Sequence, residues 1–302
     1  MSITVIDFRS YDAANPATVA ALADQLDGAL QSHGFVALTN VGVSKALRQS
    51  AYDTAAAFFA QSPSAKAAFG YRDASANFGY QGPQVEALDP SAPADLKETF
   101  TMRDLPSHRD EAALWPSPAF AAVSAELFDA CYAGAQAVLH VFAHALGVPD
   151  DFFASRHHGE NTTLRYLYYP SGAVEQVQTG QMGAGAHTDY GSITLLFQDT
   201  VGGLQLQQDD GEWLDVPAIE DTVLLNTGDL MAHWSNDRYP STMHRVAPQT
   251  GGQNRQSIAF FVDPDSSVAV QCLDRCVDQS RPARYAPTTA GEHIQRKILA
   301  TH

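Results

Sequence analysis

The sequence predicts an α+β fold with a mainly β core: a double-stranded β-helix, or jelly-roll, with N-terminal and flanking helices packed outside it. Helix-type spacing of apolar residues is concentrated in the first 150 residues, whereas most of the chain after residue 160 reads as short strands separated by turns. Short strands with frequent turn signals are typical of jelly-rolls. An α/β fold is not expected, because strands and helices are segregated along the chain rather than alternating.

Local signals define the first elements. Ile3 to Phe8 reads as a short strand, and Asn15 can cap a helix that has Pro16 in its first turn. Gly34 is expected to end this helix, and residues 35–39 read as the next strand. The helix carries one apolar stripe, formed by Val19, Leu22, Leu26 and Leu30.

Three further helices are expected. Ser44 begins the first of them, and a longer one runs over residues 118–146 and ends at Gly147. The last lies near residues 289–300. Between residues 69 and 105 the periodicity fades and Gly and Pro are frequent, so no regular element is predicted there.

We find no internal repeat and no linker that would divide the chain, so residues 1–302 are expected to form a single domain. Within it, residues 1–150 form a helix-rich N-terminal part. Residues 160–265 form the jelly-roll core, and residues 285–302 carry the C-terminal helix.

Composition excludes several classes of partner. The chain has 302 residues with a formal net charge of −16, which argues against nucleic acid or an anionic membrane as a partner. Its three cysteines are a small and odd number, which does not fit a disulfide framework and favours a reducing compartment. We see no secretory leader and no apolar run of membrane-spanning length, so a cytoplasmic protein is expected. The oligomeric state is left open.

The motif His187-x-Asp189 stands just before a strand-like run at residues 193–197. Side chains two residues apart on an extended backbone leave from the same face, so the imidazole and the carboxylate can converge on one point. A third ligand is expected from His244, which begins a second strand-like run. Two histidines and one carboxylate on one side of a metal form the ligand set of non-haem Fe(II) oxygenases. The same residue types can also bind catalytic zinc.

A second motif, Arg255-x-Ser257, follows in the next strand-like run. Arg255 and Ser257 share a face, so a guanidinium and a hydroxyl can together hold a carboxylate. The same alternation turns Phe261 inward, where it could form a substrate wall or simply part of the core.

These motifs occur in the order found in the 2-oxoglutarate/Fe(II) dioxygenases of the isopenicillin N synthase-like family, which the chain resembles over nearly its whole length. Other segments also match the family. They are Val5-Ile6-Asp7, His33-Gly34-Phe35, Asp95-Leu96-Lys97-Glu98, Gly202-Gly203-Leu204-Gln205, Asp210-Gly211-Glu212-Trp213, Val216-Pro217, Gly228-Asp229, His244-Arg245-Val246 and Thr289-Ala290-Gly291-Glu292-His293.

The resemblance implies an iron oxygenase that uses 2-oxoglutarate and O2. The three candidate ligands would hold Fe(II), and 2-oxoglutarate would take two of the open positions. Its far carboxylate would meet Arg255, Ser257 and Tyr169, the last matching a family tyrosine. The implied reaction oxidises a C–H bond of a small organic molecule, with hydroxylation as its usual outcome, and releases succinate and CO2.

Further substrate residues are expected from two regions. Arg165 shares a strand face with Tyr169 and could contact substrate or the keto acid, or could form a structural ion pair. Tyr80 and Glu98 lie in the region that forms the mouth of the active site in this family. Glu98 could meet a cationic group or pair with a surface lysine.

Three alternatives stay open at this point. An iron oxidase with the same site could take all its electrons from substrate and would not bind 2-oxoglutarate. A zinc hydrolase would use the same ligand types but would give Arg255-x-Ser257 no task. A non-catalytic binding module would keep the pocket without turnover.

The other histidines are interpreted as structural. His140 and His144 lie one helical turn apart, but no third ligand accompanies them. His157 and His158 fall in a loop and are expected at the solvated surface. His233 could lie near the metal pocket, although a packing role is expected.

Overall fold

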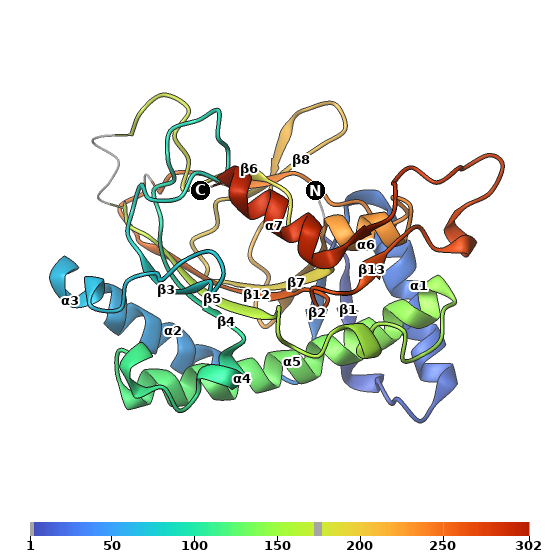
Figure 1. Cartoon of the computed structure of the whole chain (residues 1–302), viewed down its shortest axis with the longest axis horizontal. Coiled ribbons are helices and arrows are strands. Elements are labelled where there is room, and N and C mark those ends of the chain that lie inside the picture. Colours follow the sequence, from blue (N-terminus) through green and yellow to red (C-terminus); the bar gives the residue numbers. More distant parts are fainter. Residues whose placement is uncertain (1–2, 172–176, 250, 302) are drawn as a thin grey trace.

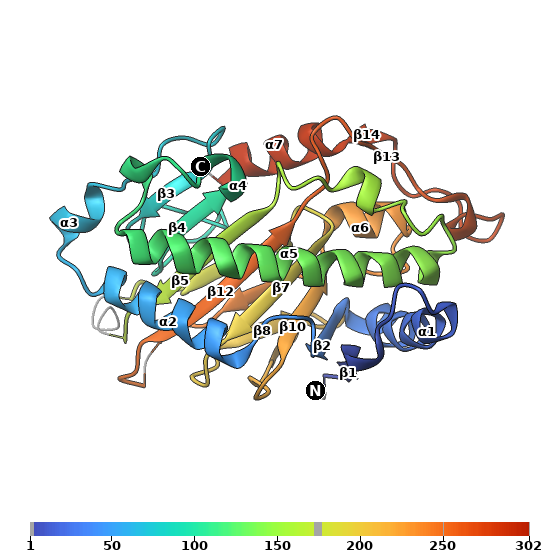
Figure 2. The same cartoon turned by 90° about the horizontal axis from the view of Figure 1, so that it is seen from below.

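A layer of helices covers one side of a large β-sheet in the computed structural model, and a smaller sheet lies on the other side (Figure 1). The structure describes residues 3–171, 177–249 and 251–301. Figure 2 shows helix α5 running across the strands of the large sheet. This arrangement confirms the predicted mainly β core with helices packed outside.

The large sheet has eight strands within the described residues, and β1 and β2 are its one parallel pair among them. Its strands are, in spatial order, β1 (Val5–Asp7), β2 (Phe35–Thr39), β10 (Val223–Thr227), β7 (Ile193–Gln198), β12 (Arg255–Val262), β5 (Thr163–Tyr169), β4 (Glu98–Arg103) and β3 (Phe78–Gln81). The smaller sheet consists of β6 (Ala184–His187), β11 (His244–Val246), β8 (Leu204–Gln207) and β9 (Trp213–Asp215). A short ladder joins β13 (Ala269–Val270) to β14 (Thr288–Thr289).

The α-helices that the structure describes are α1 (Pro16–His33), α2 (Lys45–Phe59), α3 (Pro63–Ala67), α4 (Leu105–His108), α5 (Pro118–Leu146), α6 (Asp229–Trp234) and α7 (Ala290–Thr301). The predicted helix boundaries are confirmed closely. Asn15 accepts a hydrogen bond from the backbone N–H of Ala17, and Ser44 caps α2 in the same way through Leu47. Gly34 ends α1 at φ +64°, and its missing Cβ leaves room for the carbonyl of Pro240.

Two apolar clusters hold these layers together. The larger one lies between the helices and the large sheet, where the buried stripe of α1 and one face of α5 meet the sheet. The smaller one fills the space between the two sheets. On β12 the alternation is clear, because Ile258 and Phe260 belong to the first cluster and Ala259 to the second, with Phe261 packed against it. The predicted inward face of β12 is therefore the face between the sheets.

The structure corrects two predictions about the first half of the chain. The strand expected at Ile3 to Phe8 is shorter, because Phe8 already begins a 3-10 turn, η1 (Phe8–Ser10). The region 69–105, for which no element was predicted, contains β3 and β4. Both faces of β4 are buried, and buried threonines alternate with larger side chains, so the strand lacks the usual apolar-polar signal.

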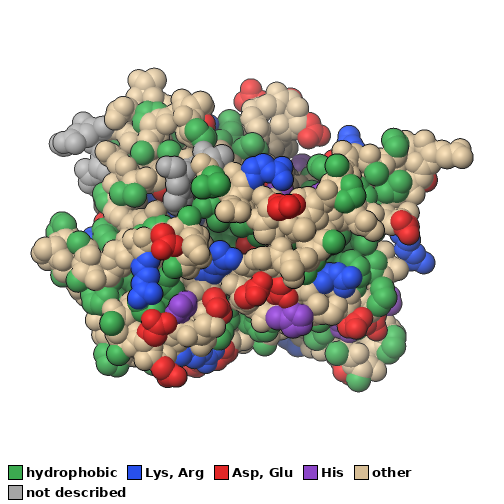
Figure 3. Space-filling model, in the orientation of Figure 1, with side chains coloured by type: hydrophobic (Ala, Val, Ile, Leu, Met, Phe, Trp, Pro, Cys, Tyr) green, Lys and Arg blue, Asp and Glu red, His purple; other side chains and the backbone are tan. Residues whose placement is uncertain are grey.

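No helix within the described residues is long and apolar enough to cross a membrane. On the face shown in Figure 3, acidic and basic side chains are interspersed rather than gathered in patches of one sign.

Candidate metal centre and adjoining pocket

His187, Asp189 and His244 converge at the rim of the smaller sheet. His187 ends β6 and His244 begins β11, and the two residues lie directly opposite each other in the antiparallel pair. Asp189 follows two residues after His187, and its Oδ1 lies 4.0 Å from Nε2 of His187 and 3.8 Å from Nε2 of His244. One potential ligand atom from each residue falls within 4.8 Å of the others, as required for a common metal ion.

Hydrogen bonds to the other polar atoms fix which atoms face the centre. Nδ1 of His187 lies 2.7 Å from the carbonyl oxygen of Gly185, and Nδ1 of His244 lies 3.0 Å from that of Thr242. Each Nδ1 therefore carries the proton and donates it, which leaves Nε2 with a lone pair. The three atoms left to face one another are two imidazole nitrogens and one carboxylate oxygen.

The carboxylate of Asp189 is held by its second oxygen. Oδ2 accepts hydrogen bonds from the hydroxyl of Thr194 on β7 and the side-chain amide of Asn226 on β10, both at 2.6 Å. Oδ1 is thereby directed toward the two histidines. These supporting residues were not identified from the sequence, because Asn226 reaches the site only through the pairing of β10 with β7.

The electrostatics suit a metal site. Burial, together with the charge of His244, lowers the pKa of His187 to about 3, which outweighs the raising effect of Asp189. The imidazole is therefore neutral at physiological pH and can donate its lone pair. Two neutral nitrogens and one carboxylate on one side of a metal are the donor set that Fe(II) takes in non-haem oxygenases.

Arg255 lies on β12 with its side chain fully buried. The guanidinium donates to Oγ of Ser257 at 3.2 Å and to Oε1 of Gln198 at 3.3 Å, and it lies over the ring of Tyr169, 4.7 Å from the centroid. Its Nε has no hydrogen-bond partner, and no carboxylate of the described residues forms an ion pair with it. The three residues predicted to hold a carboxylate therefore do lie together, around an uncompensated buried positive charge.

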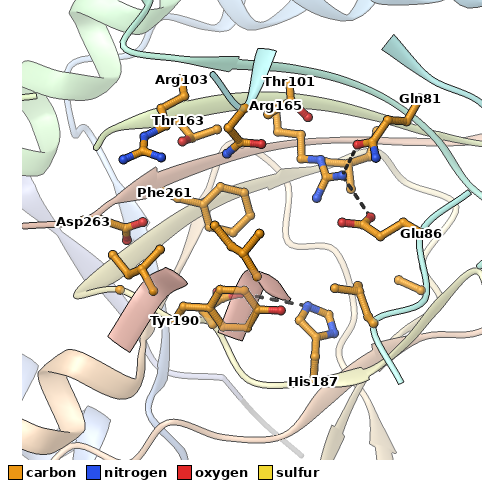
Figure 4. Close-up of a pocket in the computed structure, with 18 of the residues that line it drawn as sticks. Gln81, Glu86, Thr101, Arg103, Thr163, Arg165, His187, Tyr190, Phe261 and Asp263 are labelled. Atoms are coloured by element: carbon orange, nitrogen blue, oxygen red, sulfur yellow. Dashed lines mark hydrogen bonds and ion pairs between the residues drawn. The ribbon is translucent and has the colours of Figure 1, made fainter. Parts of the chain in front are cut away.

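A pocket opens beside His187 and Asp189 (Figure 4). Its apolar lining comes mainly from Leu88, Leu167, Phe261, Ile294 and Ile298. Phe261 thus lines the pocket, as the sequence predicted, and Figure 4 shows it with Tyr190 among the lining side chains. Two of the lining residues belong to α7, so the C-terminal helix forms part of the pocket.

Arg165 lines the pocket and is also ion-paired, so both of its expected roles remain compatible with the structure. Its Nη2 donates to Glu86 at 2.9 Å and lies 3.3 Å from the hydroxyl of Thr99 and 3.4 Å from Gln81. Burial alone would raise the pKa of Glu86, but Arg165 and Lys97 outweigh burial and hold this pKa well below its ordinary value. Glu86 is therefore a carboxylate at the pocket wall.

Tyr80 and Glu98 do not line this pocket, which corrects their assignment as substrate contacts. Side chains alternate along β4, so Thr99 and Thr101 face the pocket side while Glu98 faces the helices. There Glu98 accepts a hydrogen bond from Tyr80 Oη at 2.5 Å and is ion-paired with the buried ammonium of Lys66. The alternative expectation was a pair with a surface lysine; Glu98 does pair with a lysine, but the expected surface location is wrong, because Lys66 is buried.

Asp263 is a pocket residue that the sequence did not indicate. It follows β12 directly and packs against Gly191, where a Cβ would collide with its Oδ1. Burial raises the pKa of Asp263 to about 7; the nearby Arg103 lowers it, and Asp189 raises it further. The pocket therefore holds a carboxyl group that titrates near neutral pH.

The other histidines that the structure describes lie outside the metal cluster. His157, expected at the surface, is fully buried, with Nδ1 2.8 Å from the carbonyl of Phe153 and Nε2 2.8 Å from Oγ of Ser192. His140 forms a hydrogen bond with Tyr11 Oη at 2.9 Å, in keeping with a structural role. His233 packs on the ring of Tyr285, with centroids 4.8 Å apart.

Comparison with known proteins gives the family. The profile of the 2OG-Fe(II) oxygenase superfamily matches residues 159–264, and that of the non-haem dioxygenase N-terminal region (named for morphine synthesis) matches residues 3–118. A 2-oxoglutarate-Fe(II) type oxidoreductase of Emericella nidulans is 32% identical over 96% of this chain and 88% of its own length. The chain belongs to the 2-oxoglutarate–Fe(II) oxygenases.

Solved structures of this oxygenase family agree with the fold. A Neurospora crassa protein, crystallised in complex with α-ketoglutarate and thymine, is 31% identical, with a TM-score of 0.86 over 99% of this chain and 97% of the other. An oxygenase family protein of Caulobacter crescentus is 30% identical and covers 99% of both chains with a TM-score of 0.83. The protein is thus an oxidoreductase that uses Fe(II), 2-oxoglutarate and O2, with a double-stranded β-helix. An oxidase, a zinc hydrolase and a binding module are not favoured.

Proposed function

We propose that His187, Asp189 and His244 hold the Fe(II) of this oxygenase. The support is geometric, because their second polar atoms are all engaged and only Nε2, Nε2 and Oδ1 face the common point. Fe(II) with 2-oxoglutarate supplies O2 activation and oxidation of a C–H bond, with release of succinate and CO2. The protein residues supply the fixed ligand face, and burial keeps the imidazole of His187 neutral.

We further propose that Arg255, Ser257 and Tyr169 hold the far carboxylate of 2-oxoglutarate. The observation that carries this assignment is the buried Arg255 guanidinium, which has no carboxylate partner among the described residues and an unpaired Nε. A buried charge without a partner is costly, and a bound carboxylate would compensate it. Gln198 joins this set, since it already accepts a hydrogen bond from the guanidinium.

The proposed substrate is a small polar organic molecule bound in the pocket beside His187. Phe261 and Tyr190 offer aromatic surface, and Arg165 with Glu86 offers both donors and an acceptor at the pocket wall. The presence of thymine in the Neurospora crassa complex supports a substrate of this size and polarity. Hydroxylation is the proposed outcome. We also propose that residues 1–302 act as one domain in the cytoplasm, in keeping with the acidic composition and sparse cysteines.

Succinate formation tests this function. The purified protein with Fe(II), ascorbate and O2 should convert 2-oxoglutarate to succinate slowly, and faster when a screen of small polar molecules supplies the substrate. His187→Ala should abolish this turnover, whereas His144→Ala, which changes an exposed histidine on α5, should retain it. Oxygen consumption without succinate would instead indicate an oxidase. Hydrolysis without any dependence on Fe(II) would indicate a zinc enzyme.

A further inference from the structure

The loop between β3 and β4, residues 82–97, carries buried charges into the protein interior, where they meet a charge from β5. Glu86, Asp95 and Lys97 from the loop are all buried, and Arg165 comes from β5. Such charges are expensive to bury unless they compensate one another. The compensation must therefore come from ion pairs and hydrogen bonds that these four side chains form.

The charges alternate in sign along one connected chain. Nη2 of Arg165 and Nζ of Lys97 lie 2.9 Å and 2.8 Å from the same oxygen of Glu86. Lys97 also forms an ion pair with Oδ2 of Asp95. Two cations and two anions balance, and the loss of one member would leave a buried charge uncompensated. Figure 4 shows the Arg165 end of this chain at the pocket wall, with His187 on the opposite side of the pocket.

The other end of the chain reaches the strand that carries His187. Oδ1 of Asp95 accepts a hydrogen bond from the backbone N–H of Gly185 at 2.8 Å, and the carbonyl of Gly185 accepts from Nδ1 of His187 at 2.7 Å. Because β6 is an edge strand of its sheet, this N–H is free for a side chain. A Cβ at Gly185 would lie 2.8 Å from the backbone nitrogen of Asp89. The loop and β6 therefore approach too closely at this point for a residue with a side chain.

The loop is joined to this edge by two further hydrogen bonds. The backbone N–H of Leu96 donates to the carbonyl of Met182 at 2.9 Å, and the side-chain amide of Gln181 donates to the carbonyl of Ala94 at 2.7 Å. Residues 94–96 thus lie along the edge just before β6 begins. The position of Gly185 is set from this side by Asp95.

We propose that Asp95 and Lys97 are positioning residues for the metal site. Asp95 fixes Gly185, whose carbonyl orients the imidazole of His187, and Lys97 holds Asp95 in place while joining it to the Glu86–Arg165 pair of the pocket. The same set of four charged residues therefore contacts both the strand of the metal ligand His187 and the pocket wall at Arg165. The inference rests on the proposed role of His187 as a metal ligand.

The opposite side of β4 provides a matched control. Lys66 and Glu98 also form a buried ion pair, but on the helix-facing side of this strand, away from the pocket and from β6. Lys97→Met and Lys66→Met each remove a buried ammonium and keep most of the side-chain volume. A general effect of lost stability would appear in both variants, whereas an effect on the metal site should appear in Lys97→Met alone.

Titration of the metal-free protein with Co(II) tests the proposal without turnover, because the visible d–d absorption reports ligand geometry. Removal of a group that orients a metal ligand costs about 10–100-fold in metal affinity. Asp95→Ala and Lys97→Met should therefore bind Co(II) about tenfold or more weakly, with an altered spectrum. Asp95→Asn, which keeps an acceptor for the Gly185 N–H, should restore most of the affinity that Asp95→Ala loses. Lys66→Met should match wild type in both affinity and spectrum.

Wild-type Co(II) affinity and spectrum in folded Lys97→Met and Asp95→Ala would overturn the proposal. An equal loss in Lys66→Met would also overturn it, because the effect would then follow from stability alone. His187→Ala is measured in parallel to distinguish loss of the metal ligand itself from loss of its positioning. If His187→Ala kept wild-type Co(II) binding, the metal assignment itself would fail, and the role of Asp95 and Lys97 would fail with it.

Discussion

His187 and His244 face each other across the β6–β11 pair, with ring centroids 4.3 Å apart. Each Nδ1 donates a hydrogen bond to the carbonyl of the residue two positions earlier, so the two Nε2 atoms point toward Asp189. Two histidines that are distant in the sequence are thus oriented by the same kind of hydrogen bond to a nearby backbone carbonyl. The metal face is a property of paired strand ends, which supports a rigid, preorganised centre.

The support of Asp189 gives a first prediction. Asn226→Ala removes the amide that donates to Oδ2, so Oδ1 should no longer be held toward the histidines. We expect Fe(II) or Co(II) affinity to fall by about 10–100-fold, the usual cost of losing such a contact. Metal titration of the anaerobic protein measures it, with the exposed Asn254→Ala as the control. Equal affinity in Asn226→Ala and wild type would remove Asn226 from the site.

The buried charge chain gives a second prediction, for stability. Glu86→Gln leaves Arg165 and Lys97 buried without their shared anion, and loss of one partner from a buried pair costs about 3–5 kcal/mol in the free energy of unfolding. Urea unfolding at pH 7 measures this loss. Glu220→Gln, which removes an exposed partner of Lys45, should change little and serves as the control.

The same variant has a defined pH dependence. The pKa of Glu86 is lowered in the folded protein, so its stabilisation is present above the unfolded value of about 4.3 and is lost as pH falls below it. The stability difference between wild type and Glu86→Gln should therefore stay constant from about pH 8 to 5 and shrink below about pH 4. A difference that grew on acidification would contradict the ion-pair account.

His157 provides a third prediction. Burial lowers the pKa of His157 to about 4, so the folded protein binds fewer protons than the unfolded chain between about pH 6.5 and 4. Wild-type stability should fall across this window by roughly 3 kcal/mol from this residue, at about 1.4 kcal/mol per pKa unit. His157→Gln should lose this component of the pH dependence, whereas the exposed His144→Gln should keep it. Urea unfolding midpoints at pH 7 and pH 5 measure this difference. The same change of stability with pH in wild type, His157→Gln and His144→Gln would exclude a contribution from His157.

The third ligand, His244, joins the metal face only through the pairing of β11 with β6, but part of this face and of the carboxylate site at Arg255 could be predicted from local spacing. Arg255 and Ser257 stand two residues apart on β12, where side chains share a face, and His187 and Asp189 have the same spacing at the end of β6. Helix ends were predictable for the same reason. Asn15 and Gly34 act on backbone groups a few residues away, and the structure places both at the ends of α1.

The remaining features depend on contacts between distant segments. Buried His157 is hydrogen-bonded to Ser192, 35 residues away, and Asp189 accepts a hydrogen bond from Asn226, 37 residues away. Tyr80 and Glu98 were placed at the pocket because their region was matched to the mouth of the active site, but the pairing of β3 with β4 and of β4 with β5 puts both on the helix side.

The loop that contains Asp95 and Lys97 also combines a local feature of the sequence with a contact between distant segments. The sequence places these two opposite charges at a spacing of two, but their pairing was not predicted. Their link to Gly185 was not visible in the sequence, since a loop and an edge strand meet there.

Binding of 2-oxoglutarate beside the metal, with its far carboxylate held by Arg255, Ser257 and Tyr169, can be measured without turnover. Calorimetric titration of the anaerobic Fe(II) protein with 2-oxoglutarate compares wild type with Arg255→Ala, and Arg245→Ala on β11 serves as the control. Loss of a charge-assisted bond to a buried carboxylate costs about 2–5 kcal/mol, so affinity should fall by roughly thirty-fold or more in Arg255→Ala. Ser257→Ala should show a smaller loss, Arg245→Ala none, and iron affinity should stay largely intact throughout. Equal 2-oxoglutarate affinity in Arg255→Ala and wild type would contradict the binding of its far carboxylate by Arg255.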